Sequence, residues 1–208
     1  MSTGHLDQLL LGIADAPIAA APETGRIVVS GLTLDSRRVQ RGDAFFALRG
    51  SQAHGITFAA AAVQRGARVV LAEAPAPEAV EPLEVPVLWI DGLHAQVSEI
   101  AARLYNRPSE SMRVVGVTGT NGKTSCVQLL AQALTLLGHR AASIGTLGAG
   151  VHGQLREGER TTPDAVSVQA LLAEFRDAKA GYVAMEVSSH ALEQGRVGAV
   201  DFEVAAFT

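Results

Sequence analysis

The sequence predicts an α/β protein in which a small N-terminal α/β domain precedes part of a second domain with a parallel sheet. Short apolar runs typical of strands alternate with helical patterns, as in α/β units. A glycine-rich turn joins a strand to a helix at residues 116–124. A polar stretch with a proline, residues 106–111, separates two such series. We therefore expect domains at residues 1–110 and 111–208.

The first series opens with a helix and then a loop that runs to residue 25. Short, mostly apolar runs predict strands at 26–30, 32–34, 44–48, 69–72 and 87–90. Longer apolar stretches predict helices at 6–13, 56–65 and 93–105. Gly66 ends the second of these helices, and four prolines make residues 74–86 a loop.

The second series predicts a parallel sheet with crossover helices. Its expected strands are 114–117, 141–144, 182–187 and 200–207, and its expected helices are 124–137 and 165–179. Residues 145–159 are rich in glycine and predict a loop. The chain stops after an apolar strand, where a covering helix should follow, so we expect a fragment of a longer protein whose second domain is truncated.

Composition excludes several classes of protein. Of the 208 residues, 48% are hydrophobic and 18% charged, which favours a packed core over disorder. The net charge of −4 argues against a nucleic-acid binder that neutralises phosphates. The single cysteine excludes an intrachain disulfide, and the chain contains no apolar run of about 18 residues. The first residues have no cationic stretch, so we expect no signal peptide. We expect a cytoplasmic monomer with no nucleic-acid partner and no membrane span.

The turn at residues 116–124 has the context of a phosphate-binding P-loop, between a strand and a helix. Its glycines allow backbone N–H groups to turn toward phosphate oxygens, and the helix N-terminus favours an anion. Lys123 would reach the β- and γ-phosphates, and the Thr124 hydroxyl would bind Mg²⁺. The spacing departs from the strict motif, because Val117 stands at the first glycine position. The alternative is a glycine-rich turn without a ligand.

Glu186 stands at the carboxyl end of the second apolar strand after the turn. A carboxylate at this edge is a hard oxygen ligand suited to Mg²⁺; the alternative is a cap for the next helix. Ser188, Gln194 and Arg196 follow at the same edge and suit a large anionic ligand rich in hydroxyls. For Arg196 the alternative is a solvated charge.

Three segments carry a resemblance to the Mur ligase family of ATP-dependent amide-forming enzymes. Residues 119–124, Gly-Thr-Asn-Gly-Lys-Thr, resemble the family's nucleotide loop. Residues 34–50, with Asp-Ser-Arg and Gly-Asp-Ala-Phe-Phe, resemble the N-terminal domain of the members that extend the peptidoglycan stem; alone, they also fit a surface turn with an Asp/Arg ion pair. Residues 185–196, with Thr161-Thr162-Pro163, resemble the branch that acts at the tripeptide step.

The resemblance implies a ligase that adds the third amino acid, meso-diaminopimelate or L-Lys, to UDP-N-acetylmuramoyl-L-Ala-D-Glu through an acyl-phosphate. It implies Lys123 and Glu186 as catalytic residues, and Mg²⁺ held by Thr124 and Glu186. The implied ATP contacts are Gly119, Thr120, Asn121, Gly122, Lys123, Thr124 and Ser125. The implied contacts to the UDP-linked substrate are Leu34, Ser36, Ser51, Gln52, Ala53, Thr161, Thr162, Ser188, Gln194 and Arg196. Arg160 replaces an amide found in relatives, so its contact is not transferred.

Some parts of the family pattern would lie beyond Thr208: a carbamylated lysine, the adenine contacts and the domain for the amino acid. We therefore expect the chain to bind the UDP substrate but not to complete catalysis, and ATP affinity to be reduced. The role of His190 stays open, and Cys126 is expected to serve packing. Two alternatives remain, a folylpolyglutamate synthetase-like ligase and a non-catalytic module that binds a nucleotide or UDP-sugar.

Overall fold

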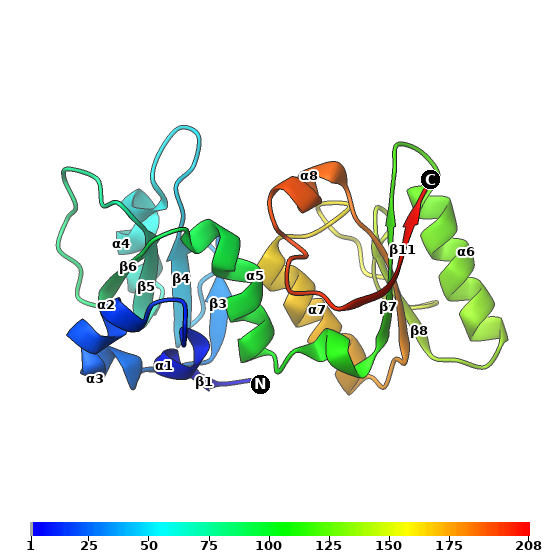
Figure 1. The fold of residues 1–208 in the computed structure, drawn as a ribbon, viewed down its shortest axis with the longest axis horizontal. Helices are drawn as coiled ribbons and strands as arrows, with labels where there is room; N and C mark the ends of the chain where they lie inside the picture. The colour runs from blue at the N-terminus through cyan, green and yellow to red at the C-terminus, as the bar shows by residue number, and fades with distance from the viewer. Residues whose placement is uncertain (1) are drawn as a thin grey trace. The chain divides into compact units, whose positions relative to one another are not determined.

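The computed structural model describes residues 2–208, which divide into two compact units between Ile100 and Ala101. Each unit has its own sheet (Figure 1). The division falls within helix α5 (Leu93–Leu104), whereas the sequence places the domain boundary after that helix, at residues 110 and 111. That boundary stays a prediction.

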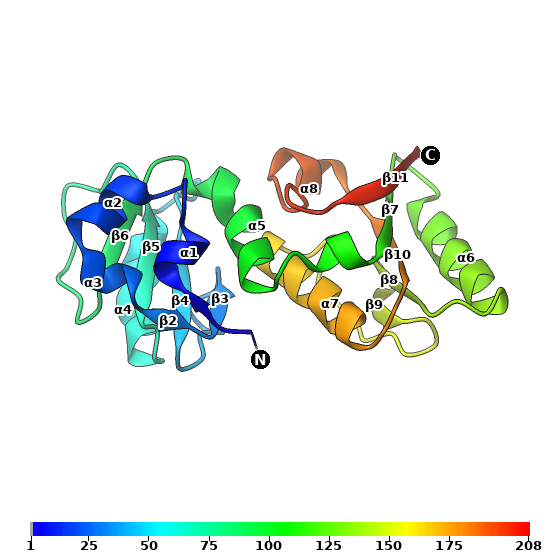
Figure 2. The same cartoon turned by 60° about the horizontal axis from the view of Figure 1, so that its bottom comes forward.

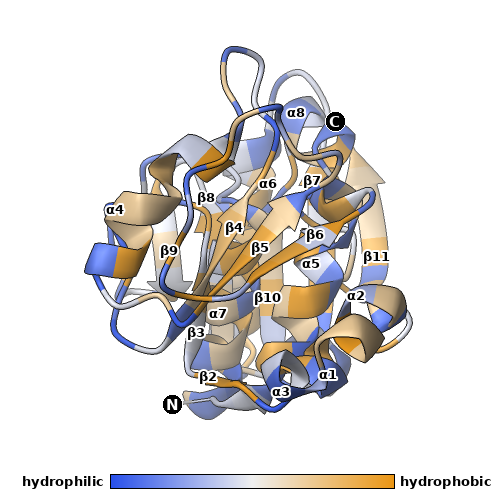
Figure 3. Cartoon of the chain, turned by 90° about the vertical axis from the view of Figure 1, so that its left-hand side faces the viewer, coloured by the Kyte–Doolittle hydropathy of each residue, from blue (hydrophilic) through white to orange (hydrophobic). Residues whose placement is uncertain are grey.

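The first unit is built on a four-stranded sheet in which all strands run parallel. Its order is β3 (Gly31–Thr33), β4 (Asp43–Ala47), β5 (Val69–Glu73) and β6 (Val87–Ile90). Every residue of β4 is buried, as expected for a central parallel strand, and Figure 3 shows β4, β5 and β6 as largely hydrophobic. The 3₁₀ helix η1 (Gly55–Phe58) and α4 (Ala59–Gln64) occupy the helix predicted at 56–65.

The N-terminal segment differs from the prediction. The predicted helix at 6–13 ends early as α1 (Leu6–Leu9), and the predicted loop contains α2 (Asp15–Ala20) and α3 (Pro22–Gly25). Pro22 begins α3, where a missing N–H costs little. The strand predicted at 26–30 is only β2 (Val28–Val29), which pairs antiparallel with β1 (Gly4–His5) (Figure 2).

The second unit has a five-stranded sheet in the order β11, β7, β10, β8, β9. Four strands are parallel, and β9 is antiparallel to β8. The bounds of the strands are Arg113–Thr118 for β7, Ala141–Gly145 for β8, Gly148–Val151 for β9, Tyr182–Glu186 for β10 and Phe202–Phe207 for β11. The helices are η2 (Pro108–Ser111), α6 (Lys123–Leu136), α7 (Ala165–Asp177) and α8 (Ser189–Glu193).

Helices α6 and α7 cover opposite faces of this sheet (Figure 1). Side chains alternate along β10, because successive residues of a strand point to opposite faces. Val183 and Met185 pack in the cluster that contains α7, whereas Ala184 packs with Val127 of α6. This alternation places Glu186 on the same side as Ala184.

The prediction of a loop at 145–159 is wrong for residues 148–151, because β9 pairs there with β8 as the second strand of a hairpin. Gly148 has a φ of +111°, and a Cβ there would overlap the carbonyl oxygen of Arg156, so glycine permits the reversal. The sequence gives no bounds for the short helix α8. Among residues 2–208, no helix combines the length and apolarity that crossing a bilayer demands.

Candidate functional site

The glycine-rich turn lies between β7 and α6. Gly119 and Gly122 have φ values of +131° and +84°, a region that glycine adopts without steric cost. Within residues 2–208, no side chain caps α6 at Gly122, and N–H groups at such a helix start can meet an anion. The Lys123 ammonium folds back over the turn, where it donates to the carbonyls of Gly119 (2.7 Å) and Thr120 (3.3 Å). The turn thus combines N–H groups with a positive charge.

Glu186, at the carboxyl end of β10, is only 1% exposed. Its Oε2 accepts hydrogen bonds from the hydroxyls of Thr124 (3.0 Å) and Thr146 (3.2 Å). Its Oε1 accepts from the backbone N–H of Thr146 (2.8 Å). Glu186 does not cap helix α8, since Ser188 fills that role by accepting from Ala191 N–H. The structure therefore brings Thr124 and Glu186 together as the sequence suggests.

The oxygens of Thr124 and Glu186 fit Mg²⁺ in kind. Mg²⁺ prefers oxygen ligands and usually binds one or two carboxylates together with phosphates and waters. The residues described here contain no cluster of three or more His, Cys, Asp or Glu side chains that could form a complete protein cage. A magnesium ion at this position would consequently depend on phosphate oxygens held by the neighbouring turn.

A polar rim adjoins Glu186. The Thr162 hydroxyl donates to the carbonyl of Glu186 (2.8 Å) and accepts from the N–H of Ser188 (3.1 Å), so its hydrogen is already engaged. Arg196 donates from Nη1 to the Thr162 carbonyl (2.7 Å). Its Nε and Nη2 donate to Oε1 of Gln194 (2.9 and 2.6 Å). The guanidinium is therefore held in place and is not simply a solvated charge.

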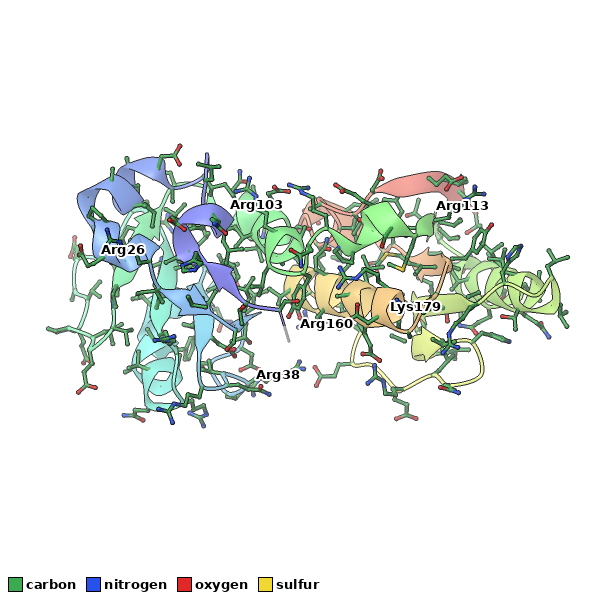
Figure 4. All side chains as sticks on the ribbon, turned by 90° about the horizontal axis from the view of Figure 1, so that it is seen from below. Arg26, Arg38, Arg103, Arg113, Arg160 and Lys179 are labelled. Atoms are coloured by element: carbon green, nitrogen blue, oxygen red, sulfur yellow. The ribbon has the colours of Figure 1, made fainter. Side chains whose placement is uncertain are left out.

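Burial lowers the pKa of Arg196, and the positive charge of Arg160 lowers it further. Arg160, labelled in Figure 4, immediately precedes Thr161 in the loop before α7. The Thr161 hydroxyl lies 3.1 Å from that of Thr146. The rim residues predicted from sequence, Thr161, Thr162, Ser188, Gln194 and Arg196, thus gather beside Glu186. Positive charge here favours an anionic ligand.

The predicted residues of the first unit lie in loops at the carboxyl ends of its strands. Leu34 and Ser36 follow β3, while Ser51, Gln52 and Ala53 follow β4 and are exposed. Beside Ser36, Arg37 makes an ion pair with Asp35 (Nη2 to Oδ2, 2.8 Å), which lowers the pKa of Asp35 to about 2. The surface ion pair considered as an alternative for this turn is therefore present. Ligands bind at such strand ends in open parallel sheets.

Sequence reasoning missed two residues that organise these sites. Thr146 follows β8 and contacts Glu186 with two groups. Glu73 ends β5, and its carboxylate accepts from the N–H groups of Arg49 (3.0 Å) and His94 (3.3 Å). The signal for Glu73 was available, because it is a carboxylate at the carboxyl end of a strand, as Glu186 is. Thr146 gave no such signal.

Two further expectations concern single side chains. Cys126 lies on α6 but is exposed, so the expectation that it serves packing is wrong for the described chain. His190 is exposed on α8.

Two family models match the chain. The model described as "Mur ligase family, catalytic domain" matches residues 28–105, and "Mur ligase middle domain" matches residues 117–208. Together they include every site residue discussed above.

Similar curated proteins are named UDP-N-acetylmuramoyl-L-alanyl-D-glutamate–2,6-diaminopimelate ligase. The protein of Ectopseudomonas mendocina (strain ymp) is 52% identical over 188 residues, 90% of this chain and 38% of its own length. That of Xanthomonas oryzae pv. oryzae (strain MAFF 311018) is 54% identical over 182 residues, 88% of this chain and 37% of its own. The chain therefore spans less than two fifths of these relatives.

Solved structures show the same fold. A structure of a UDP-N-acetylmuramoyl-L-alanyl-D-glutamate–2,6-diaminopimelate ligase matches all of this chain and 40% of its own, with a TM-score of 0.78 and 29% identity. A structure of the UDP-N-acetylmuramoylalanyl-D-glutamyl-2,6-diaminopimelate–D-alanyl-D-alanyl ligase from Acinetobacter baumannii, at 20% identity and a TM-score of 0.60, covers 94% of this chain and 41% of its own. This second match supports the α/β architecture alone.

Proposed function

Because the chain belongs to the Mur ligase family, we propose that it forms the UDP-substrate unit and the phosphate-binding part of an ATP-dependent ligase. The ligase would add the third amino acid to UDP-N-acetylmuramoyl-L-Ala-D-Glu during peptidoglycan synthesis, and so serve cell shape and division from the cytoplasm. The pairing of Thr124 with Glu186, beside the rim that holds Arg196, carries this proposal. The names of the relatives favour diaminopimelate over L-Lys as the added amino acid.

The proposed reaction has two steps. A carboxylate oxygen of the D-Glu residue attacks the γ-phosphorus of ATP, so that ADP leaves and an acyl-phosphate forms. The amine nitrogen of the incoming amino acid then attacks the acyl carbon and loses a proton, and inorganic phosphate leaves with the bonding electrons. Catalysis of such transfers rests on positioning and on neutralising charge.

The phosphate loop would hold the donor. The N–H groups at the start of α6 and the Lys123 ammonium would contact the phosphates, with Gly119 to Ser125 forming the ATP site. Thr124 and Glu186 would hold Mg²⁺, which neutralises phosphate charge when bound. Lys123 exchanges its present bonds to loop carbonyls for bonds to phosphate oxygens.

The rim and the first unit would hold the acceptor. Arg196, fixed by Gln194 and the Thr162 carbonyl, would bind a carboxylate of the muramoyl-dipeptide. Thr161 and Ser188 would contribute polar groups beside it. The uridine part would contact Leu34, Ser36 and the loop of Ser51, Gln52 and Ala53.

Calorimetric titration of the folded chain with UDP-N-acetylmuramoyl-L-Ala-D-Glu tests the proposal, with UDP-N-acetylglucosamine as the control ligand. We expect selective binding of the muramoyl-dipeptide, weakened by Ser36→Ala and by Arg196→Ala. The Arg196 change should cost about tenfold or more, as for a charged hydrogen bond. Equal binding of both ligands, or none, would contradict the proposal. Tripeptide formation by these 208 residues alone would contradict the expectation that further parts are needed.

A further inference from the structure

Glu186 presents two oxygens with unlike surroundings. Oε1 receives the rigid backbone N–H of Thr146, whereas Oε2 receives the side-chain hydroxyls of Thr124 and Thr146. When another group binds Oε2, the Thr146 N–H still holds Oε1. The carboxylate is thus fixed at one oxygen and available at the other.

The hydroxyl of Thr146 is fixed in direction by its neighbours. A carboxylate only accepts, so the single hydroxyl hydrogen of Thr146 points to Glu186 Oε2. The contact with Thr161 is then donated by Thr161. Hydrogen bonds therefore run from Thr161 through Thr146 to Oε2 of Glu186, and Thr124 donates to the same oxygen. Thr146 is the side chain that lies between the acceptor rim and the proposed cation ligands.

We propose that Thr146 is a positioning residue of the nucleotide–cation site, which orients the Glu186 carboxylate toward Thr124 through its backbone N–H and its hydroxyl. The inference rests on the proposed function. Groups that hydrogen-bond a metal ligand fix its orientation, and their loss typically lowers metal affinity about 10- to 100-fold. If Thr146 only satisfied a buried carboxylate, its removal would change stability and leave Oε2 freer for a cation.

Thr146→Val tests the role of the hydroxyl, since valine keeps the shape and the backbone N–H. Mn²⁺ affinity is measured by electron paramagnetic resonance with ADP present, and ADP affinity by calorimetry with a chelator. We expect Mn²⁺ affinity to fall about tenfold, while ADP affinity without metal changes less than about twofold. Thr146→Ser should restore Mn²⁺ binding, which a loss of packing would not allow.

Thr135→Val is the matched control. The Thr135 hydroxyl donates to the Ala131 carbonyl within α6, away from Glu186. The Thr135→Val variant should therefore bind Mn²⁺ with the affinity of the unaltered chain. In a Glu186→Gln background, Thr146→Val should have no further effect, because the two residues act as one unit.

The outcomes separate the two proposals. If the unaltered folded chain binds no Mn²⁺ with ADP, the proposed nucleotide site and this inference both fail. If Glu186→Gln weakens Mn²⁺ binding but Thr146→Val does not, the site stands and the inference is overturned. The inference is also overturned if the losses of Mn²⁺ affinity caused by Glu186→Gln and Thr146→Val add up when the two changes are combined.

Discussion

The carboxylate of Glu186 occupies the space that a side chain on Gly145 would need. A Cβ at Gly145 would overlap Glu186 Oε1 and lie 2.8 Å from its carboxyl carbon. Gly145 ends β8 and Glu186 ends the adjacent β10, so the carboxylate at one strand end fills the space beside the end of the neighbouring strand. The absence of a side chain at Gly145 is thus a condition for the position of the carboxylate.

Gly145→Ala should therefore displace Glu186 and separate it from Thr146 N–H. We expect a stability loss of about 1–3 kcal/mol from overpacking and weaker Mn²⁺ binding with ADP. Urea unfolding and Mn²⁺ titration measure the two effects. Gly181→Ala is the control, because a Cβ there meets no atom within 4 Å and its φ lies outside the left-handed region. If Gly145→Ala and Gly181→Ala had the same stability and the same Mn²⁺ affinity, the steric argument would be contradicted.

Glu73→Ala should loosen the loop that carries Ser51, Gln52 and Ala53. The change removes the carboxylate that accepts from the N–H groups of Arg49 and His94. A hydrogen bond to a charged acceptor contributes about 1.5–3 kcal/mol to stability. Faster amide hydrogen exchange at both residues and at least about tenfold weaker binding of the UDP substrate are expected. Glu73→Gln should weaken substrate binding less than Glu73→Ala does. Glu78→Ala, a change at an exposed residue, should alter neither the amide exchange nor the substrate binding. Unchanged exchange at Arg49 in Glu73→Ala would rule this role out.

Asp35 should titrate with a midpoint of about 2, because Arg37 stabilises its charged form. Its unfolded pKa is about 3.9, so the ion pair stabilises the fold fully above that pH. This contribution disappears as the pH falls from about 4 to about 2, and it is under about 1 kcal/mol because the Arg37 side chain is 83% exposed. Carboxyl NMR titration should show the midpoint rising in Arg37→Gln. An unmoved midpoint would contradict the assignment.

Asp43 should destabilise the fold at neutral pH. Burial raises its pKa, although the Gln40 N–H donates to its Oδ2 (2.8 Å). A raised folded pKa means that stability is greatest below the unfolded pKa and is lost as the pH rises through the folded pKa. Asp43→Asn keeps an acceptor oxygen, so it should be more stable than the unaltered chain at pH 7 and equal to it near pH 3.5. Urea unfolding at both pH values measures the free energy of unfolding. If Asp43→Asn were more stable at both, the burial of the Asp43 charge would not be the cause.

The elements that sequence predicted well have strong local signals. The strand at 87–90 is apolar throughout and has the predicted bounds, and β4 and β7 differ from prediction by one residue at each end. β9 was missed because its glycines resemble a loop, and only pairing with β8 makes it a strand. The N-terminal helices are too short to show helical periodicity.

The residues of the candidate site were mostly predictable, but their arrangement was not. A glycine-rich turn and a carboxylate at the end of a strand can both be recognised in the amino-acid sequence alone. The role of Thr146 depends on β10 lying between β7 and β8, although it follows both in the chain. Sequence order alone would not place β8 beside the strand that ends in Glu186.

The alternation along β10 restricts changes in the length of this strand. Ala184 packs with α6, and Glu186, two residues later, reaches Thr124 at the start of the same helix. Inserting or deleting one residue between them would send the carboxylate to the face that α7 covers, because strand side chains alternate with a period of two. Amino-acid exchanges within β10 can therefore preserve the site, whereas a frame-preserving codon insertion at this point would abolish it.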